Sequence, residues 1–185
     1  MNIANQFTIL RILLSFVCVF LISSGTLVNL FLGLLFFFLA SLTDFFDGYF
    51  ARRRNIVSDF GRLMDPVADK ILVIGVFLAF LKLNIVSAAA VTIIVFREFL
   101  VTGLRLYALS KNYVLEAKSF GKHKTFTQMA GIVIIIIILL MSKLGVILSS
   151  VAHRLIFIVV SWIVIVTIFS GGMYLWKNRK LIKSF

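Results

Sequence analysis

Four aspartates are the residues of this sequence best suited to chemistry, because of their spacing. Asp44 and Asp47 lie three residues apart, and Asp65 and Asp69 lie four residues apart. On an α-helix, which turns by about 100° per residue, each pair falls on a single stripe. The connection between the two pairs is short, so their helices are expected to be antiparallel neighbours with facing stripes. The pattern predicts four carboxylates gathered between two helices.

Crowded carboxylates cannot all remain ionised unless cations compensate their charge. Ligand sets made only of oxygen favour hard divalent ions over zinc, and no histidine or cysteine lies within this segment. We therefore expect Mg²⁺ as the cofactor, with Mn²⁺ as an alternative, held by Asp44, Asp47, Asp65 and Asp69. Two ions about 4 Å apart would use the whole set and would clamp a pyrophosphate.

Small residues and one arginine share these stripes, namely Gly48, Ala51, Gly61 and Arg52. Small residues in membrane helices let backbones approach closely, but here they also clear space for a bulky ligand such as a nucleotide. Arg52, at the stripe's edge, suits a phosphate. Salt bridges to the neighbouring arginines are the alternative role for the aspartates. It explains Asp59 better than the stripe residues, since an intramembrane charge costs about 2.5–3.5 kcal/mol.

The composition places these motifs in a membrane protein. The chain has 185 residues, of which 62% are apolar and 14% charged. A soluble domain is about half apolar and about a quarter charged, so an ordinary soluble globule, a disordered chain and a disulfide scaffold are excluded. The net charge of +12 is explained by the positive-inside effect and an anionic leaflet. We therefore expect lipid, and no nucleic acid, as the surroundings of the chain.

Charge-free stretches predict six transmembrane helices. We place them at about 6–23, 28–52, 60–82, 86–109, 125–142 and 155–176. A turn at Ser23-Ser24-Gly25-Thr26 and Asn29 divides the long charge-free run 12–43. Lysines and arginines concentrate in the second and fourth connections and in the tail, so both termini are expected in the cytoplasm. The sequence predicts an all-α, multi-pass protein of the cell membrane, with one domain over 1–185 and a cytoplasm-facing active-site cavity.

The full pattern Asp-x2-Asp-Gly-x2-Ala-Arg-x8-Gly-x3-Asp-x3-Asp resembles the signature of the CDP-alcohol phosphatidyltransferase family, with all eight defining positions filled. The resemblance implies a six-helix fold, a two-metal site, and transfer of the phosphatidyl group of a CDP-linked lipid to an alcohol with release of CMP. It also implies a homodimer formed through membrane helices. The residues implied to bind CDP-diacylglycerol are Asn5, Thr8, Asp44, Gly48, Ala51, Arg52, Ser58 and Gly61. Asn5 and Thr8 have an alternative role as caps of the first helix.

A second polar cluster, which is basic, bears on the alcohol. Its members are Arg97, Glu98, Thr102 and Arg105 in the fourth helix and Lys118, Lys122 and Lys124 in the loop that follows. A phosphorylated acceptor needs such paired cations, whereas serine or inositol does not. The stretches 97–105, 118–125 and 2–11 resemble the branch of the family that uses sn-glycerol 3-phosphate. The residues expected to hold the acceptor phosphate are Arg97, Arg105, Lys118 and Lys122. The lysines have an alternative role as ordinary positive-inside residues.

The expected mechanism makes Asp69 the general base for the 1-hydroxyl of glycerol 3-phosphate. That oxygen attacks the phosphorus next to diacylglycerol, and CMP leaves. A carboxylate that binds metals is a weak base, so direct attack by a metal-polarised hydroxyl is a rival. Inositol phosphate is the nearest alternative acceptor. A cation transporter that uses the aspartates as its ion path and a catalytically silent scaffold are the alternatives from other classes.

Overall fold

The described part of the chain is helical throughout. The computed structural model describes residues 3–54, 59–110 and 118–179, and no strand occurs in these ranges. Inside the helices, the side chains of 3–5, 7, 44–54, 59–66, 69, 109–110 and 118–123 lie outside the description. The helices are α1 (Ile3–Ser24), α2 (Leu27–Arg54), α3 (Asp59–Lys82), α4 (Ala88–Ser110), α5 (Lys118–Lys143) and α6 (Ser149–Lys177). The predicted all-α class is confirmed.

Four of the helices match the predicted ranges to within three residues at either end, but α5 and α6 begin six or seven residues earlier than predicted. The prediction took the charge-free runs as the limits of the helices. Backbone hydrogen bonding continues through charged residues at a helix end, where long side chains reach water. The sequence-based placement of Lys118, Lys122 and Lys124 in a loop is therefore wrong, because all three belong to α5.

The predicted turn between the first two helices is confirmed, with one adjustment. Gly25 has a positive φ of 67°, which glycine adopts without steric cost. Thr26 then caps α2, since its Oγ1 accepts a hydrogen bond from the backbone N–H of Asn29 at 3.3 Å. Asn29 itself lies inside α2, and its Nδ2 donates to Ser24 Oγ at 2.7 Å. The polar residues of this turn thus form hydrogen bonds with one another, and Asn29 does so from within α2.

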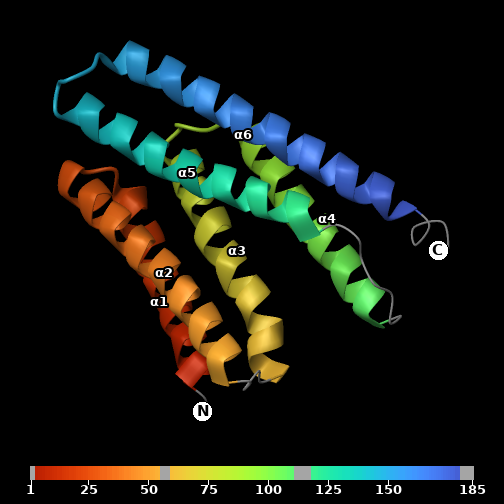
Figure 1. Cartoon of the computed structure of the whole chain (residues 1–185). Coiled ribbons are helices and arrows are strands. Elements are labelled where there is room, and N and C mark those ends of the chain that lie inside the picture. The colour runs from red at the N-terminus through yellow and green to blue at the C-terminus, as the bar shows by residue number, and fades with distance from the viewer. Residues whose placement is uncertain (1–2, 55–58, 111–117, 180–185) are drawn as a thin grey trace.

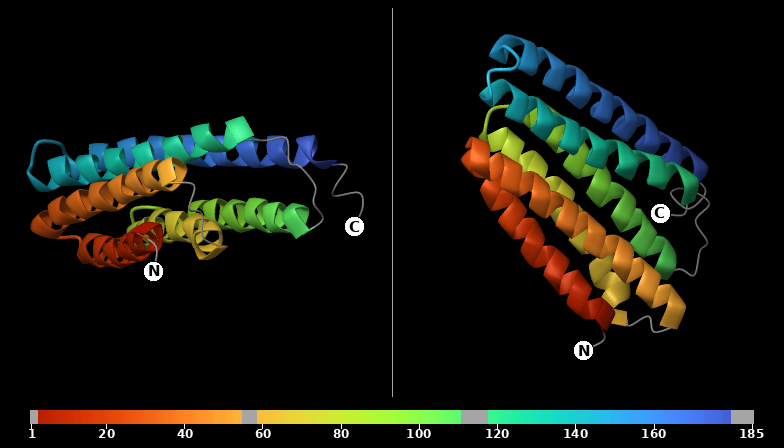
Figure 2. Two further views of the ribbon diagram at one scale, coloured as in Figure 1. Left: turned by 60° about the horizontal axis from the view of Figure 1, so that its bottom comes forward. Right: turned by 60° about the vertical axis from the view of Figure 1, so that its left-hand side comes forward.

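The helices form two groups that pack against each other. The neighbours of α1 are α2 and α3, while α5 pairs with α6, and α4 packs against α6 and α3. Figure 1 shows α1 and α2 running side by side, and Figure 2 shows the α5–α6 hairpin along one side of the other helices. Contacts of α5 with α2 and α3 join the groups. Buried apolar side chains fill the interior, including Ile22, Leu30, Phe37, Val76, Phe77, Phe80, Ile94, Ile132, Ile135 and Ile163.

Large apolar side chains also cover the outside of the molecule. Two helical stretches among the described residues, Lys124–Lys143 and Ser149–Lys177, are long and apolar enough to cross a membrane. Shorter apolar stretches run over Thr8–Ser24 and Leu27–Thr43. The exposed residues include Phe16, Phe20, Phe31, Phe157, Trp162 and Phe169. Exposed apolar surface on this scale suits contact with lipid chains, in agreement with the membrane class predicted from composition.

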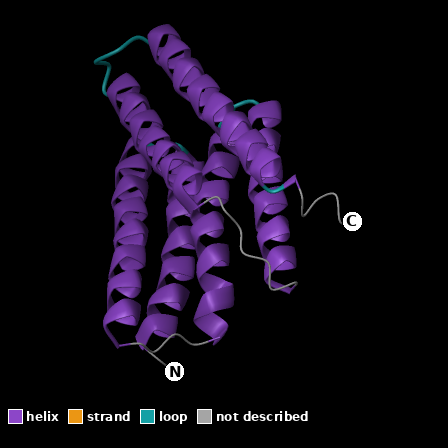
Figure 3. Ribbon diagram, turned by 45° about the vertical axis from the view of Figure 1, so that its right-hand side comes forward, coloured by secondary structure: helices purple, strands orange, loops and turns teal. Residues whose placement is uncertain are grey.

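Successive helices run in alternating directions. The first residues of α1, α3 and α5 and the last residues of α2, α4 and α6 therefore lie toward one end of the molecule (Figures 1 and 3). The aspartate motif occupies the last half of α2 and the first half of α3. Both parts of the motif thus lie toward this end, which is the end that positions the candidate site.

Candidate functional site

The aspartate motif lies on two helices that contact each other. Asp44 and Asp47 belong to α2, and Asp65 and Asp69 belong to α3, as predicted. The same helices carry Gly48, Ala51 and Arg52 on α2 and Gly61 on α3. The helical spacing therefore holds along both segments, although the side chains of these eight residues lie outside the description. Ser58 lies outside the described residues altogether.

The packing of α1 against α2 sets a register that reaches the motif. Cys18 Sγ donates a hydrogen bond to the Gly33 carbonyl oxygen at 3.3 Å. The two helices are antiparallel, so seven residues from this contact Arg11 lies level with Ala40. Side chains on a helix lean toward its N-terminus, and for Arg11 this is the direction of Asp44. Asp44 lies one turn further along α2, about 6 Å at 1.5 Å per residue.

The packing of α1 against α3 gives a second, independent estimate of where Arg11 lies along the molecule. A Cβ on Gly75 would lie 2.6 Å from Val19 Cγ2, so the two backbones approach closely here. The two helices run in the same direction. Eight residues toward their starts, Arg11 therefore lies level with a point between Asp65 and Asp69. The register places Arg11 beside both halves of the aspartate motif.

Arg11 is a buried charge that the sequence-based prediction of the site did not include. Its exposed fraction is 1%, and Thr8, one turn earlier, is equally buried. The only acidic side chain that the structure describes, Glu98, already binds two other cations. The acids nearest Arg11 by register are the motif aspartates. A lone arginine within an otherwise apolar segment was the signal in the sequence that identifies it.

The alternative capping role of Thr8 is wrong. Because α1 begins at Ile3, Thr8 lies in the second turn, beyond the position where a side chain caps the first N–H groups. It faces the interior on the same stripe as Arg11 and Ser15, whose Oγ donates to the Arg11 carbonyl oxygen at 2.7 Å. Asn5 lies in the first turn, and its side chain is outside the description.

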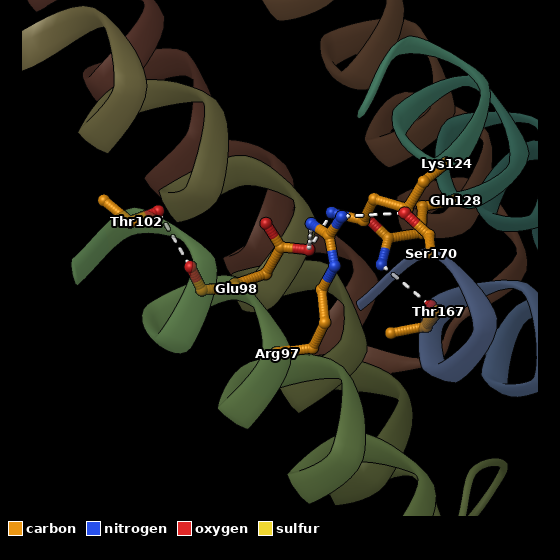
Figure 4. A network of polar contacts seen from close by, with 7 residues as sticks. All are labelled: Arg97, Glu98, Thr102, Lys124, Gln128, Thr167 and Ser170. Carbon is orange, nitrogen blue, oxygen red and sulfur yellow. Dashed lines mark hydrogen bonds and ion pairs between the residues drawn. The ribbon is translucent and has the colours of Figure 1, made fainter. Parts of the chain in front are cut away.

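A second polar centre joins α4 to α5. Glu98 Oε1 accepts from Arg97 Nη1 at 3.4 Å and also forms an ion pair with Lys124 (Figure 4). Glu98 and Lys124 are 7% and 4% exposed. The sequence-based prediction placed Lys124 in a loop. Its burial is the larger correction, since Lys124 lies six residues after the first residue of α5. One carboxylate thus serves two cations in a buried setting.

Helix α6 supplies the other side of this centre. Arg97 Nη2 donates to Ser170 Oγ at 2.9 Å, and Gln128 Nε2 donates to Thr167 Oγ1 at 3.4 Å (Figure 4). Thr102 Oγ1 donates to the Glu98 carbonyl oxygen at 2.8 Å, which occupies that hydroxyl within α4. The sequence-based prediction of the site included neither Ser170 nor Gln128. Both are polar residues in or beside long apolar runs, which is the signal that marks them.

Two further cations lie within electrostatic reach of the centre. Arg105 is exposed, yet its charge acts on that of Arg97. Lys70 of α3 acts in the same way on Lys124. Lys70 directly follows Asp69 in the chain, and α3 contacts α5, so the helix of Lys124 packs against the helix that carries this part of the aspartate motif. Lys118 and Lys122 lie on α5 ahead of Lys124, with side chains outside the description.

Two buried donors of this region lack a hydrogen-bond partner among the described residues, namely Arg97 Nε and the Tyr174 hydroxyl. Buried polar groups in native proteins are normally paired. The buried Lys124 and the partly buried Arg97 also share one described carboxylate. Together these groups give the region the chemistry of an anion site. Glycerol 3-phosphate is an anion that such a region suits.

The candidate metal ligands are the four motif aspartates. The side chains that the structure describes contain no group of three or more His, Cys, Asp or Glu residues that could hold a metal ion. The motif supplies oxygen donors from two contacting helices, and the buried Arg11 lies level with them. Such a donor set fits Mg²⁺ or Mn²⁺ and does not fit zinc.

Comparison with known proteins gives the same family as the motif. The family model for CDP-alcohol phosphatidyltransferase matches residues 1–170. A protein of Rickettsia typhi is 41% identical over 136 residues, which cover 74% of this chain and 76% of that protein. One of Bacillus subtilis is 34% identical over 161 residues, covering 82% and 76%. Both relatives are named CDP-diacylglycerol–glycerol-3-phosphate 3-phosphatidyltransferase.

Proposed function

The chain belongs to the CDP-alcohol phosphatidyltransferase family, and from this premise we propose that it transfers the phosphatidyl group of CDP-diacylglycerol to sn-glycerol 3-phosphate. The products are phosphatidylglycerophosphate and CMP. The relatives in Rickettsia and Bacillus carry the name of this reaction. The observation that supports it most directly is the surplus of positive charge around Glu98.

The positive charge near Glu98 favours an acceptor alcohol that carries a negative charge. Among the described side chains, Arg97 and Lys124 share one carboxylate, that of Glu98, and the charge of Arg105 acts on that of Arg97. Unpaired charge in a low-dielectric interior is costly. The phosphate of glycerol 3-phosphate would compensate it, whereas serine or inositol would leave it uncompensated. Arg97 Nε is a donor that the phosphate can take up.

The donor lipid is assigned to the other group of helices. Asp44, Asp47, Asp65 and Asp69 would hold Mg²⁺, which when bound neutralises the pyrophosphate and the charge that develops on departing CMP. We assign Asn5, Thr8, Arg52 and Ser58 to the CDP moiety, with Gly48, Ala51 and Gly61 clearing space for it. Arg11 of α1 lies level with both halves of the motif and adds a positive charge from the helix that packs against α2 and α3.

The transfer step joins the two centres. Asp69 accepts the proton of the 1-hydroxyl, and the freed oxygen forms a bond to the phosphorus next to diacylglycerol. The bond from that phosphorus to CMP breaks, and CMP leaves with the electron pair. The contact between α3 and α5 supports this assignment, because it puts the helix of Lys124 against the helix that carries Asp69. Arg97, Arg105, Lys118 and Lys122 hold the acceptor phosphate meanwhile.

We further propose six membrane spans, with the motif end in the cytoplasm. The turns at the opposite end carry few basic residues, namely Lys82, Lys143 and Arg154. At the motif end, the Arg179 guanidinium lies 5.1 Å from the centre of the exposed Trp176 ring. Tryptophan and arginine together are typical of the interface between lipid and water. This orientation gives glycerol 3-phosphate access from the cytoplasm.

An acceptor panel on purified protein tests the proposed reaction. CDP-diacylglycerol and Mg²⁺ are supplied with glycerol 3-phosphate, inositol phosphate, inositol or serine, and CMP and lipid products are measured by mass. We expect product with glycerol 3-phosphate alone, abolished by EDTA. Product with serine or inositol would overturn the assignment of the basic centre to a phosphate, and product with inositol phosphate alone would replace glycerol 3-phosphate as the acceptor. Folded protein in lipid that releases no CMP with any acceptor would overturn the reaction, and ion-flux measurements would then test the transporter alternative.

A further inference from the structure

We propose that Ser170 and Gly171 of α6 form a seat that positions the Arg97 guanidinium for the acceptor phosphate. The inference rests on the proposed function, which assigns Arg97 to that phosphate. It adds positioning residues from a helix that carries none of the aspartates. The seat is defined by these two residues throughout.

Gly171 sets the position of the stem of Arg97. A Cβ built on Gly171 would lie 3.1 Å from Arg97 Cγ and 4.0 Å from its Nε. A contact of 3.1 Å is tighter than carbon atoms normally accept, so any larger residue here would displace the arginine. The next residue, Gly172, has nothing within 4 Å of the corresponding point. The two adjacent glycines therefore differ in one respect that an experiment can use.

Ser170 sets the orientation of the guanidinium. Its Oγ accepts from Arg97 Nη2 at 2.9 Å, while Glu98 accepts from Nη1 at 3.4 Å (Figure 4). These contacts occupy the two ends of the planar group, and Nε stays without a partner among the described residues. A guanidinium recognises phosphate through donors in a fixed fork, so its orientation decides whether they reach the ligand.

Without the seat, Arg97 has a competing partner close by. Glu98 is its sequence neighbour, and the hydrogen bond from Nη2 to Ser170 is the contact that holds Nη2 on the side of α6 among the described residues. A displaced guanidinium would pair more fully with Glu98, and the phosphate would lose its ligand. The seat thus acts on binding of the acceptor through Arg97, and binding of CDP-diacylglycerol should stay unchanged. A loss confined to the acceptor is the signature of such a positioning role.

The test compares Gly171→Ala and Ser170→Ala with the control Gly172→Ala. Both alanine-for-glycine variants raise helix propensity equally, so their difference reports the contact with Arg97. We expect Gly171→Ala and Ser170→Ala to raise KM for glycerol 3-phosphate about tenfold, the loss of one hydrogen bond to a charged group. KM for CDP-diacylglycerol should change less than about twofold in all three variants. Gly172→Ala should match the wild type.

A binding measurement keeps this test independent of turnover. Glycerol 3-phosphate should raise the unfolding temperature of wild type and Gly172→Ala more than that of Gly171→Ala, since at one ligand concentration a tighter-binding protein is stabilised more. If the wild type binds but releases no CMP, the proposed function fails and the seat is judged by binding alone. Equal behaviour of Gly171→Ala and Gly172→Ala would overturn the seat. So would equal losses toward donor and acceptor, which would indicate a general structural role.

Discussion

Glu98 of α4 and Lys124 of α5 form an ion pair in which both side chains are almost fully buried. The two residues come from helices separated in the chain by a connection outside the described residues. Their pairing leaves Arg97 bound to a carboxylate that is already neutralised. The positive charge that remains is what the proposed acceptor would meet.

Replacing Glu98 by Gln should destabilise the fold. The change removes the only described carboxylate of the centre and leaves the buried Lys124 and the partly buried Arg97 without their shared partner. Breaking a buried pair costs about 3 kcal/mol, so the apparent unfolding temperature should fall by about 6–12 °C. Thermal unfolding in detergent measures this. The double variant Glu98→Gln with Lys124→Met should recover at least half of the loss, and a double variant less stable than either single one would contradict the pairing.

Replacing Arg11 by Met should impair use of the donor lipid. Arg11 lies level with both halves of the aspartate motif and is buried, so its loss removes positive charge next to the expected pyrophosphate. We expect kcat/KM for CDP-diacylglycerol to fall at least about tenfold, with KM for glycerol 3-phosphate little changed. Arg11→Lys should retain part of the activity. Arg154→Met, at the opposite end of the molecule, is the control, and an equal effect there would rule out a local role for Arg11.

Replacing Asp47 or Asp65 by Asn should abolish activity, with a loss of about a hundredfold or more. Each change removes one charged ligand for a divalent ion while keeping the size of the side chain. Asp59→Asn is the matched control, because Asp59 is the first residue of α3 and lies off the motif stripe. CMP release across a Mg²⁺ titration measures the effect. Asp69→Asn with near-normal turnover and Mg²⁺ dependence would contradict the general-base role.

Replacing Gly75 by Ala should loosen the contact that sets the register of Arg11. The added Cβ would lie 2.6 Å from Val19 Cγ2, so either the Val19 side chain or the two helices must shift. Overpacking of this kind costs about 1–3 kcal/mol. Gly103→Ala in α4, where nothing lies within 4 Å, should be neutral or stabilise by up to about 1 kcal/mol. Thermal unfolding of the two variants compares them, and a Gly75→Ala protein as stable as Gly103→Ala would contradict the close approach.

Much of the fold follows from the sequence, because charge-free runs are the direct physical requirement of a helix in lipid. The placement of the four aspartates on two contacting helices was also predicted correctly from the sequence, because each pair lies within one continuous helical segment and the connection between the segments is short. The early starts of α5 and α6 did not, because charged residues end a span without ending a helix. The burial of Lys124 was missed for the same reason.

The contribution of α6 could not be predicted from spacing. Ser170 and Gly171 lie in a nearly all-apolar helix, and only its packing against α4 selects the face that meets Arg97. Arg11 is an intermediate case. Its charge in an apolar segment was visible, but the level at which it meets α2 and α3 depends on the contacts of Cys18 and Gly75.

The division of the helices into two groups has a consequence for how such a protein can change. The aspartate motif lies on α2 and α3, beside α1, whereas the groups that we assign to the acceptor centre on Arg97, Glu98, Lys124 and Ser170 of α4, α5 and α6. On this assignment, substitutions in the second group would alter the acceptor while the donor site on α2 and α3 keeps its residues. One donor site could then be combined with different headgroups, each selected by changes on α4, α5 and α6.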